Sequence, residues 1–292
     1  MRYLEDSRII LKTMSNRIKV SFSENGKSLE EVLRGRGISR RLITRLKRTQ
    51  GGITRDGKLI RTVDKVFDGD EIILSESDHK LLIPNGGLSV PVLYEDDQLI
   101  VFNKPPFMPV HPSINHQTDT LGNLFAYMFP NLTFRPVNRL DRDTSGCVIA
   151  AKNQLSAQRL QKSYEKVYYG ICCGKFEHDK GIIDAPVARE NESIIKRCVR
   201  ADGQHAVTHY EVLKQGERYA FVKFLLENGR THQIRVHMSY IGHPIAGDDM
   251  YGGECTDFSR QALHCGKIII LHPETNQKLE ISAPSEIMTY EL

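Results

Sequence analysis

A polar run directly ahead of an apolar stretch holds the residues best suited to covalent chemistry. The run at 137–146 reads VNRLDRDTSG, and the stretch at 147–150 reads CVIA. The apolar residues predict a short buried strand, so we expect the polar run to form a loop held against a rigid element. Asp141 and Asp143 bring two carboxylates into this loop, where neighbouring arginines could keep both ionised. An ionised carboxylate in such a loop can act as a nucleophile or as a general base.

Two further segments combine polar donors with strand-like patterns. The first reads KVYYGI at 166–171, and the second reads GRTHQIRVHM at 229–238. Alternation predicts that the second segment is a strand. Arg235 would then share a face of that strand with three polar residues, Thr231, Gln233 and His237. His232 and His237 are five residues apart, a spacing that suits a metal pair in neither a strand nor a helix, so no metal site is predicted.

Together these three segments resemble the signature motifs of the RluA-type pseudouridine synthases. The run at 137–146 is similar to the family's catalytic loop, with Asn138 at the position where the family usually has His. The resemblance implies that Asp141 is the catalytic aspartate and that Tyr168 stacks on the target base and assists proton transfer. It also implies that Arg235 makes a bidentate contact with the catalytic carboxylate. Asn138 cannot titrate, so a proton-transfer role is not expected at that position.

The implied reaction converts uridine into pseudouridine. The bond from nitrogen-1 to the ribose breaks, the uracil rotates, and a bond from carbon-5 to the ribose forms. No electron or group comes from outside, so neither a cofactor nor a metal is expected. The aspartate could attack the ribose, attack the base, or remove a ribose proton, and the sequence favours none of the three. Because a stacked uracil must be flipped out to react, we expect Arg139 to fill the gap left in the RNA, with Arg142 and Arg230 as further RNA contacts.

Basic residues are concentrated at the start of the chain. Residues 1–80 hold 18 Lys and Arg against 12 Asp and Glu, whereas residues 81–292 hold 22 against 24. Ser28 to Glu31 fits a capping box that starts one short helix, and a second helix is expected from about Ser39. The Asp56–Gly57 turn predicts a hairpin after them. Four arginines on the second helix are expected to bind phosphate: Arg40, Arg41, Arg45 and Arg48. This arrangement resembles a small RNA-binding domain named after a ribosomal small-subunit protein.

The stretch PNGG at 84–87 is the expected linker between two domains. We predict a small basic RNA-binding domain at 1–83, with its core at about 15–76, and a catalytic domain at 84–292. Expected elements of the latter include strands at 92–94 and 99–102, a helix ending near Met128, and helical character from Leu155 to Tyr164. The resemblance implies an α+β fold, in which a mixed, largely antiparallel sheet follows a small domain of helices and a β-hairpin.

The composition is that of a globular protein. No stretch approaches 18 consecutive apolar residues, and the first residues are too acidic and polar for a signal peptide. The six cysteines show no disulfide spacing. We therefore expect a cytoplasmic protein with no membrane or protein partner.

The main prediction is an RNA pseudouridine synthase that acts on structured RNA, above all ribosomal large-subunit RNA. One alternative is transfer RNA as the substrate, and another is a non-catalytic RNA-binding or ribosome-assembly factor. A third is a glycosidase or nucleosidase that uses Asp141 and Asp143 as paired carboxylates.

Overall fold

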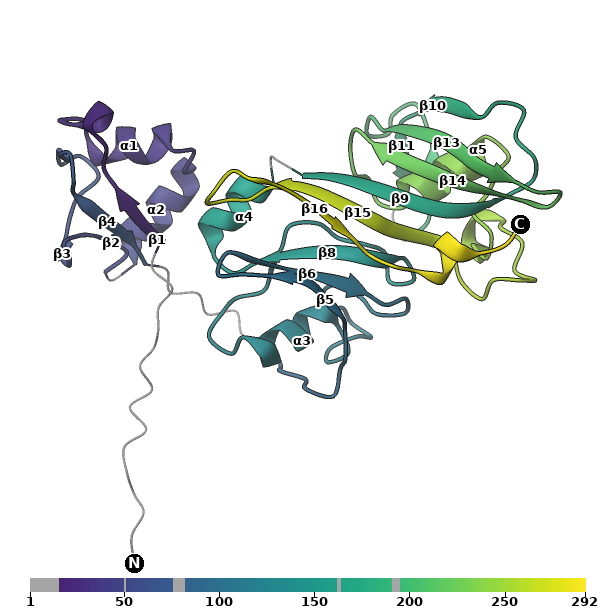
Figure 1. The fold of residues 1–292 in the computed structure, drawn as a ribbon, viewed down its shortest axis with the longest axis horizontal. Helices are drawn as coiled ribbons and strands as arrows, with labels where there is room; N and C mark the ends of the chain where they lie inside the picture. The colour runs from purple at the N-terminus through teal and green to yellow at the C-terminus, as the bar shows by residue number, and fades with distance from the viewer. Residues whose placement is uncertain (1–15, 50, 76–81, 162–163, 191–194) are drawn as a thin grey trace, which may run out of the picture.

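The computed structural model describes residues 16–49, 51–75, 82–161, 164–190 and 195–292. These residues form a four-stranded sheet near the N-terminus, a ten-stranded sheet that spans the rest of the chain, and a separate two-stranded hairpin (Figure 1). Each of the two larger sheets has its own buried apolar cluster. The predicted boundary at residues 83 and 84 lies between the last strand of the small sheet and the first strand of the large one.

The small sheet packs against two short helices. Its strands run in the order β1-β4-β2-β3, all antiparallel. Their bounds are Asn16–Lys19 for β1, Ile53–Arg55 for β2, Lys58–Leu59 for β3 and Glu71–Leu74 for β4. The helices are α1, Leu29–Gly35, and α2, Arg40–Arg48. The capping box at Ser28 is confirmed, because the Ser28 side chain accepts the Glu31 N–H while the Glu31 carboxylate accepts the Ser28 N–H.

Helix α2 divides its side chains as the sequence predicts. Ser39 caps its start, and three apolar residues are buried: Leu42, Ile43 and Leu46. The arginines of the helix are exposed. The hairpin turn is also confirmed, since Asp56 and Gly57 both have positive φ angles, of 48° and 79°, as a type I′ turn requires. This small unit therefore presents a basic helix to solvent.

The large sheet is mixed and largely antiparallel, which confirms the predicted α+β class. Its order is β10-β13-β14-β9-β15-β8-β6-β5, with β16 paired to β15 and β7 paired to β8. Only the β15–β8 pair within it is parallel, among the described residues. The bounds are Val92–Glu95 (β5), Leu99–Lys104 (β6), Arg135–Pro136 (β7), Ser145–Ala151 (β8), Tyr164–Cys173 (β9), Lys180–Asp184 (β10), Val207–Gln215 (β13), Tyr219–Leu226 (β14), Leu263–Leu271 (β15) and Lys278–Ser282 (β16). Strand β8 is buried along its whole length, which explains the uninterrupted apolar stretch that marks it.

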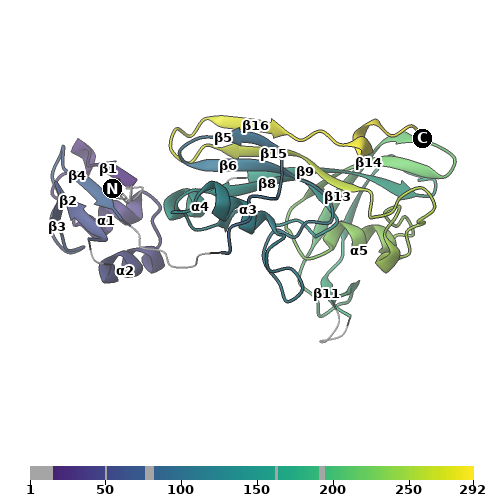
Figure 2. The same ribbon diagram turned by 90° about the horizontal axis from the view of Figure 1, so that it is seen from below.

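Three helices accompany the large sheet: α3, Leu121–Met128; α4, Gln154–Leu160; and α5, Gln233–Tyr240. The separate hairpin pairs β11, Val187–Arg189, with β12, Arg197–Val199. Figure 2 shows that α5 and β11 lie on the same side of the sheet. Thr120 caps α3. None of the helices in the described ranges has the length and apolar character that a membrane span needs.

One predicted element is wrong, and a second is confirmed but shorter than predicted. The segment at 229–238 is a turn followed by α5, not a strand. Its residues 233–238 are all buried. The alternation of polar and apolar residues therefore does not separate a face that meets the core from a face that meets solvent. Gln233 and His237 both bond Thr208 Oγ1, because residues four apart share one face of a helix. The helix expected from Leu155 to Tyr164 ends at Leu160, and Tyr164 begins β9.

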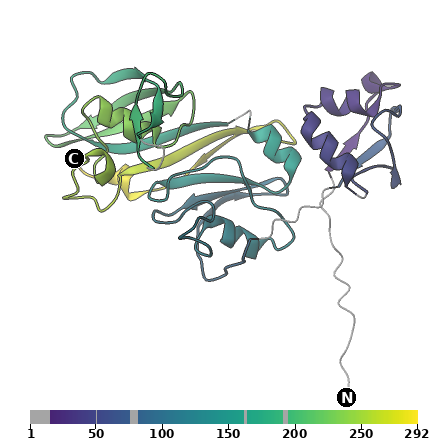
Figure 3. The same cartoon turned by 180° about the vertical axis from the view of Figure 1, so that it is seen from behind.

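Helix α4 contacts the small unit. The Gln158 side chain accepts the Ser39 N–H and donates to the Gly37 carbonyl, and Leu155 packs in the apolar cluster of the small unit. Figure 3 shows α4, in teal, beside the purple helices when the molecule is seen from behind. The start of α2 is therefore anchored on the large unit.

Candidate active site

The loop that holds Asp141 is fixed to the large sheet by buried polar groups. Lys104, the last residue of β6, is fully buried, and its ammonium donates to the carbonyls of Pro105, Met108 and Arg142 at 2.8–2.9 Å. Burial lowers the pKa of Lys104 to about 7. All three carbonyls are satisfied at once only by the protonated ammonium, which has three N–H donors. One buried cation thus holds the backbone next to Asp141.

Asn138 ties the same loop to β8. Its side-chain nitrogen donates to the Cys147 carbonyl at 3.0 Å, and its side-chain oxygen accepts the Ile149 N–H at 2.8 Å. The residue is 3 % exposed. Asn suits this place because one amide offers a donor and an acceptor together. The residue that departs from the family's usual His therefore has both polar atoms bound to backbone.

Gly146 ends the loop and begins the strand. Its φ is 115°, and an added Cβ would lie 2.2 Å from the carbonyl oxygen of Cys265 on β15. Only glycine fits this conformation and this close approach. Because β8 and β15 pair here, Gly146 allows the loop to leave the sheet directly beside the backbone of β15.

Arg235 contacts Asp141, but the bidentate contact goes elsewhere. Its Nη1 donates to Asp141 Oδ2 at 3.1 Å. Its Nε and Nη2 bind the two oxygens of Asp248 at 2.6 and 2.8 Å. The side chain of Asp248 is 0 % exposed and that of Arg235 is 6 % exposed. The implied bidentate pair with Asp141 is therefore corrected to a single N–H, and Asp248 receives the guanidinium fork.

The charge of Arg235 is fixed by these partners. Burial acts against it, but the hydrogen bonds to Asp248 and the charges of Asp248 and Asp141 raise the pKa of Arg235 above its ordinary value. Among the described residues, no hydrogen bond reaches Asp141 Oδ1. Arg235 thus holds one oxygen of the Asp141 carboxylate and not the other.

Tyr168 and Lys166 form a second wall on β9. Tyr168 is 5 % exposed, and burial raises its pKa well above the ordinary value of a phenol. Lys166 Nζ lies 5.5 Å from the centre of its ring, and burial lowers the pKa of Lys166. Tyr169, the next residue, belongs to the opposite face of the strand and stacks on Phe221. Tyr168 is therefore a neutral, rigid ring with a cation over one of its faces.

These residues line one small cavity. It has a volume of about 70 Å³ and includes Asp141, Tyr168, Lys166, His232 and Arg235 in its wall. Asp141, Lys166 and other members of this wall also line a larger groove of about 1100 Å³. Asp143 lines neither space and instead pairs with Arg142. This separation argues against paired carboxylates acting across one bond.

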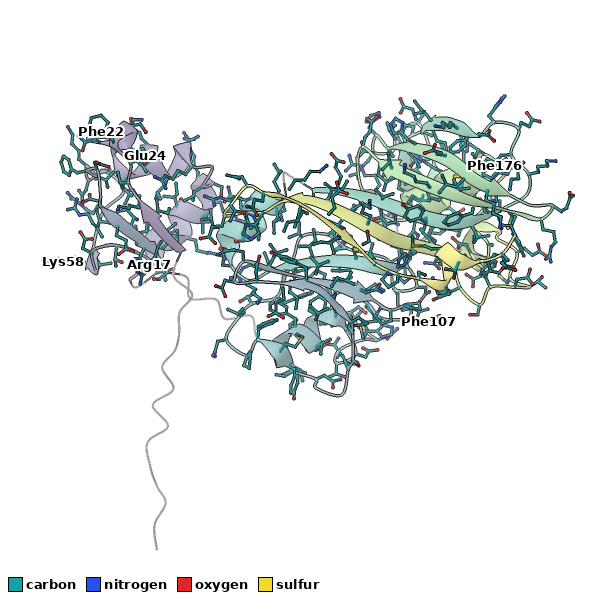
Figure 4. All side chains as sticks on the ribbon, viewed as in Figure 1. Arg17, Phe22, Glu24, Lys58, Phe107 and Phe176 are labelled. Atoms are coloured by element: carbon teal, nitrogen blue, oxygen red, sulfur yellow. The ribbon has the colours of Figure 1, made fainter. Side chains whose placement is uncertain are left out.

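The arginines proposed as RNA contacts fall into two groups. Arg139 and Arg230 line both the small cavity and the groove. Arg142 lines the groove, although its fork binds Asp143 at 2.7 and 3.1 Å. The second group lies on α2, where all four side chains are exposed: Arg40, Arg41, Arg45 and Arg48. Arg36, also in the basic stretch, is bound by Glu24, which lies beside α1 (Figure 4).

Three residues of this site are not predicted from the sequence. Asp248 lies 13 residues beyond Arg235, Lys104 belongs to a strand, and His232 has no sequence pattern that indicates a role in catalysis. The segment GHPIAGD at 242–248 is similar to the family and gives a weak signal for Asp248. No group of three His, Cys, Asp or Glu placed to hold a metal occurs among the residues that the structure describes.

Known proteins are similar to this chain in sequence and in fold. Residues 98–240 match the family described as RNA pseudouridylate synthase. An uncharacterized RNA pseudouridine synthase of Bacillus subtilis is 39% identical over 237 residues, which are 77% of each chain. Ribosomal large subunit pseudouridine synthase D of Pseudomonas aeruginosa is 35% identical over 260 residues, 80% of each chain.

A solved structure agrees. Human RNA Pseudouridylate Synthase Domain Containing 1 superposes with a TM-score of 0.57 at 25% identity, covering 70% of this chain and 86% of the human one. The chain therefore belongs to the RNA pseudouridine synthases, enzymes that isomerise uridine in RNA to pseudouridine.

Proposed function

We propose that this enzyme isomerises a specific uridine in ribosomal large-subunit RNA, with Asp141 as the nucleophile or base. The main support for this proposal is that Asp141, Arg235 and Tyr168 all line the same small cavity. An acid, its cationic partner and an aromatic ring are the groups that a pyrimidine nucleoside needs for this chemistry.

Asp141 reacts through the oxygen that Arg235 leaves free. The Arg235 N–H holds Oδ2, so Oδ1 is the oxygen that attacks the ribose or the base, or that removes the ribose proton. The fork of Arg235 on Asp248 fixes the direction of that N–H. The carboxylate is thus aimed before the substrate arrives, which lowers the entropic part of the barrier.

Tyr168 packs on the uracil and assists the transfer of the carbon-5 proton. Its raised pKa, a consequence of burial, keeps the phenol neutral. A neutral phenol can relay a proton only by accepting one on its oxygen while it gives up its own. The ring itself supplies an apolar face on which a base can stack.

The groove receives the RNA strand, and Arg139 fills the space of the flipped uridine. Arg139 is exposed and lies on both the groove and the small cavity. Arg142 and Arg230 contact RNA in the same groove. The α2 arginines hold a more distant part of the RNA through phosphate contacts, which give affinity without reading the sequence.

Large-subunit RNA is the proposed target because several relatives at 32–35% identity are named as ribosomal large-subunit enzymes. A target of this kind implies that the enzyme works in the cytoplasm.

The test is a map of pseudouridines in total RNA, by carbodiimide modification and primer extension, from strains with and without the gene. The proposal expects one or a few signals in large-subunit RNA to vanish in the deletion strain and to return with the plasmid-borne gene. Loss of a signal in transfer RNA alone would contradict the proposed substrate. An unchanged map would contradict the proposed activity in the cell.

A further inference from the structure

His232 stands at the start of α5 in an unfavourable backbone conformation. It is the N-cap of the helix, its φ is 58° and its ψ is 18°, and its side chain makes no capping bond. Residues with a Cβ rarely adopt this left-handed conformation. Where one does, the surroundings fix it, and such positions cluster at functional sites. The conformation places the imidazole in the wall of the small cavity.

A hydrogen-bond chain indicates which ring nitrogen of His232 carries the proton. The Tyr251 hydroxyl oxygen accepts the Arg197 N–H at 2.8 Å and lies 2.8 Å from His232 Nδ1. Burial raises the pKa of Tyr251 to about 12, so its hydroxyl keeps its proton. We assign this proton to the bond with Nδ1, because the oxygen already accepts the Arg197 N–H. When Nδ1 accepts, the proton of a neutral imidazole is on Nε2.

The ring is neutral and its Nε2–H is unused. Burial lowers the pKa of His232, and the charges of Arg235 and Arg197 act in the same direction. The charges of Asp141 and Asp248 oppose this shift. Nε2 lies 3.8 Å from Asp141 Oδ2, which is too long for a hydrogen bond. Among the described residues, this N–H donor beside Asp141 has no hydrogen-bond partner.

We propose that the Nε2–H of His232 is a catalytic hydrogen-bond donor to the uracil, which stabilises the negative charge that develops on a carbonyl oxygen of the base. When the bond from nitrogen-1 to the ribose breaks, its electron pair stays with the uracil and spreads onto the carbonyl oxygens. Attack on the base places charge on the same oxygens. His232 therefore acts in each route open to Asp141, and no proton leaves the imidazole. A hydrogen-bond donor that points at developing charge stabilises the transition state more in a closed cavity than in water.

The test compares two amide substitutions that differ by one methylene. In His232→Gln the amide nitrogen lies near the place of Nε2, whereas in His232→Asn it lies near Nδ1 and leaves the cavity without a donor. Asn is the better tolerated of the two in the left-handed conformation, so a loss confined to Asn is not a folding effect. Thermal denaturation of both full-length variants checks this.

The substrate is total RNA from the deletion strain, which holds whatever uridine the enzyme modifies. The inference rests on the proposed catalytic site, but product in transfer RNA instead of ribosomal RNA would leave it intact. We expect His232→Asn to lower kcat about 100-fold or more with KM nearly unchanged, and His232→Gln to stay within about 10-fold of the parent. His178→Gln, at an exposed site away from the cavity, is the control.

Two results would overturn the inference. If Gln were as inactive as Asn while both remained folded, the position would need a group that titrates, and the parent's kcat/KM would fall as pH drops through the pKa of the imidazole. If Asn turned over like the parent, the N–H would contribute nothing. A donor gives a flat profile from pH 6 to 8, since the Nε2–H is present in both protonation states.

Discussion

The guanidinium of Arg235 divides its donors between two carboxylates, and this division fixes the position of Asp141, the proposed catalytic residue. Two N–H groups bind the fully buried Asp248 and one binds Asp141. Asp248 does not line the small cavity or the groove, so its role is to position Arg235. A buried pair of this kind is costly to break, because removal of one charge leaves the other buried and uncompensated.

Asp248→Asn should therefore lower both stability and turnover. We expect the free energy of unfolding to fall by about 3–5 kcal/mol, measured by urea denaturation, and kcat to fall in the fraction that stays folded. The matched control is Asp143→Asn, which breaks the more exposed pair with Arg142 and should cost about 1 kcal/mol or less. An equal fall in the free energy of unfolding in the two variants would mean that the burial of Asp248 does not make its ion pair more important for stability.

At this scale the sequence indicates the proposed reacting groups more readily than the residues that hold them in place. Asp141, Tyr168 and Arg235 belong to short motifs that are recognisable without a structure. Asp248 could not be predicted as the partner of the Arg235 fork, because the turn of α5 and the following loop decide which carboxylate it meets. Lys104 has the same character in one respect, since the Arg142 carbonyl that it binds lies 38 residues further along the chain.

At the scale of elements, the catalytic loop depends on the strand that follows it. Asn138 and Gly146 bind its two ends to the sheet. The sequence predicts this loop and strand correctly, because a buried central strand is apolar throughout. It predicts α5 incorrectly as a strand. Every side of this short helix is buried, so its polar residues do not mark a solvent-facing side. Gln233 and His237 are polar because they bond the buried Thr208.

Substitution of Gly146 tests the close approach of loop and sheet. Gly146→Ala should destabilise the protein by about 1–3 kcal/mol from backbone strain alone, and by more from the contact with Cys265. Gly35→Ala is the control, because its Cβ meets open space at the end of α1 and alanine favours a helix. Differential scanning calorimetry should show a lower Tm for the first variant and an equal or higher Tm for the second. A Tm for Gly146→Ala that equals the parent's would contradict the argument.

At the scale of the whole molecule, the basic small unit and the catalytic groove are joined through α4. Gln158 and Leu155 contact the start of α2 and its core, so the exposed arginines of α2 are linked to the large sheet. The sequence predicts the helices and hairpin of the small unit, because caps and turns are local signals. It could not predict the contact with α4, which depends on side chains more than 100 residues apart.

RNA binding by α2 should be visible in the salt dependence of affinity. Arg40→Gln, Arg41→Gln and Arg48→Gln together should weaken binding and reduce the slope of log affinity against log salt by about 2–3, since each lost phosphate contact removes about 0.7–0.9. The control removes three exposed lysines from the same unit, Lys27, Lys58 and Lys65; Lys58 lies at the hairpin tip (Figure 4). Equal slopes for the two triple variants would show that α2 has no special part in binding.

The Asp141 carboxylate is the group proposed to isomerise uridine within RNA. The most direct measurement uses total RNA from the deletion strain, the purified parent and the Asp141→Asn variant, with pseudouridine counted by nuclease digestion and mass spectrometry, and RNA binding followed in parallel. We predict that the variant binds RNA like the parent, because no bound phosphate depends on this side chain, and that it forms no pseudouridine. Turnover by a folded Asp141→Asn protein at a rate near that of the parent would contradict the account.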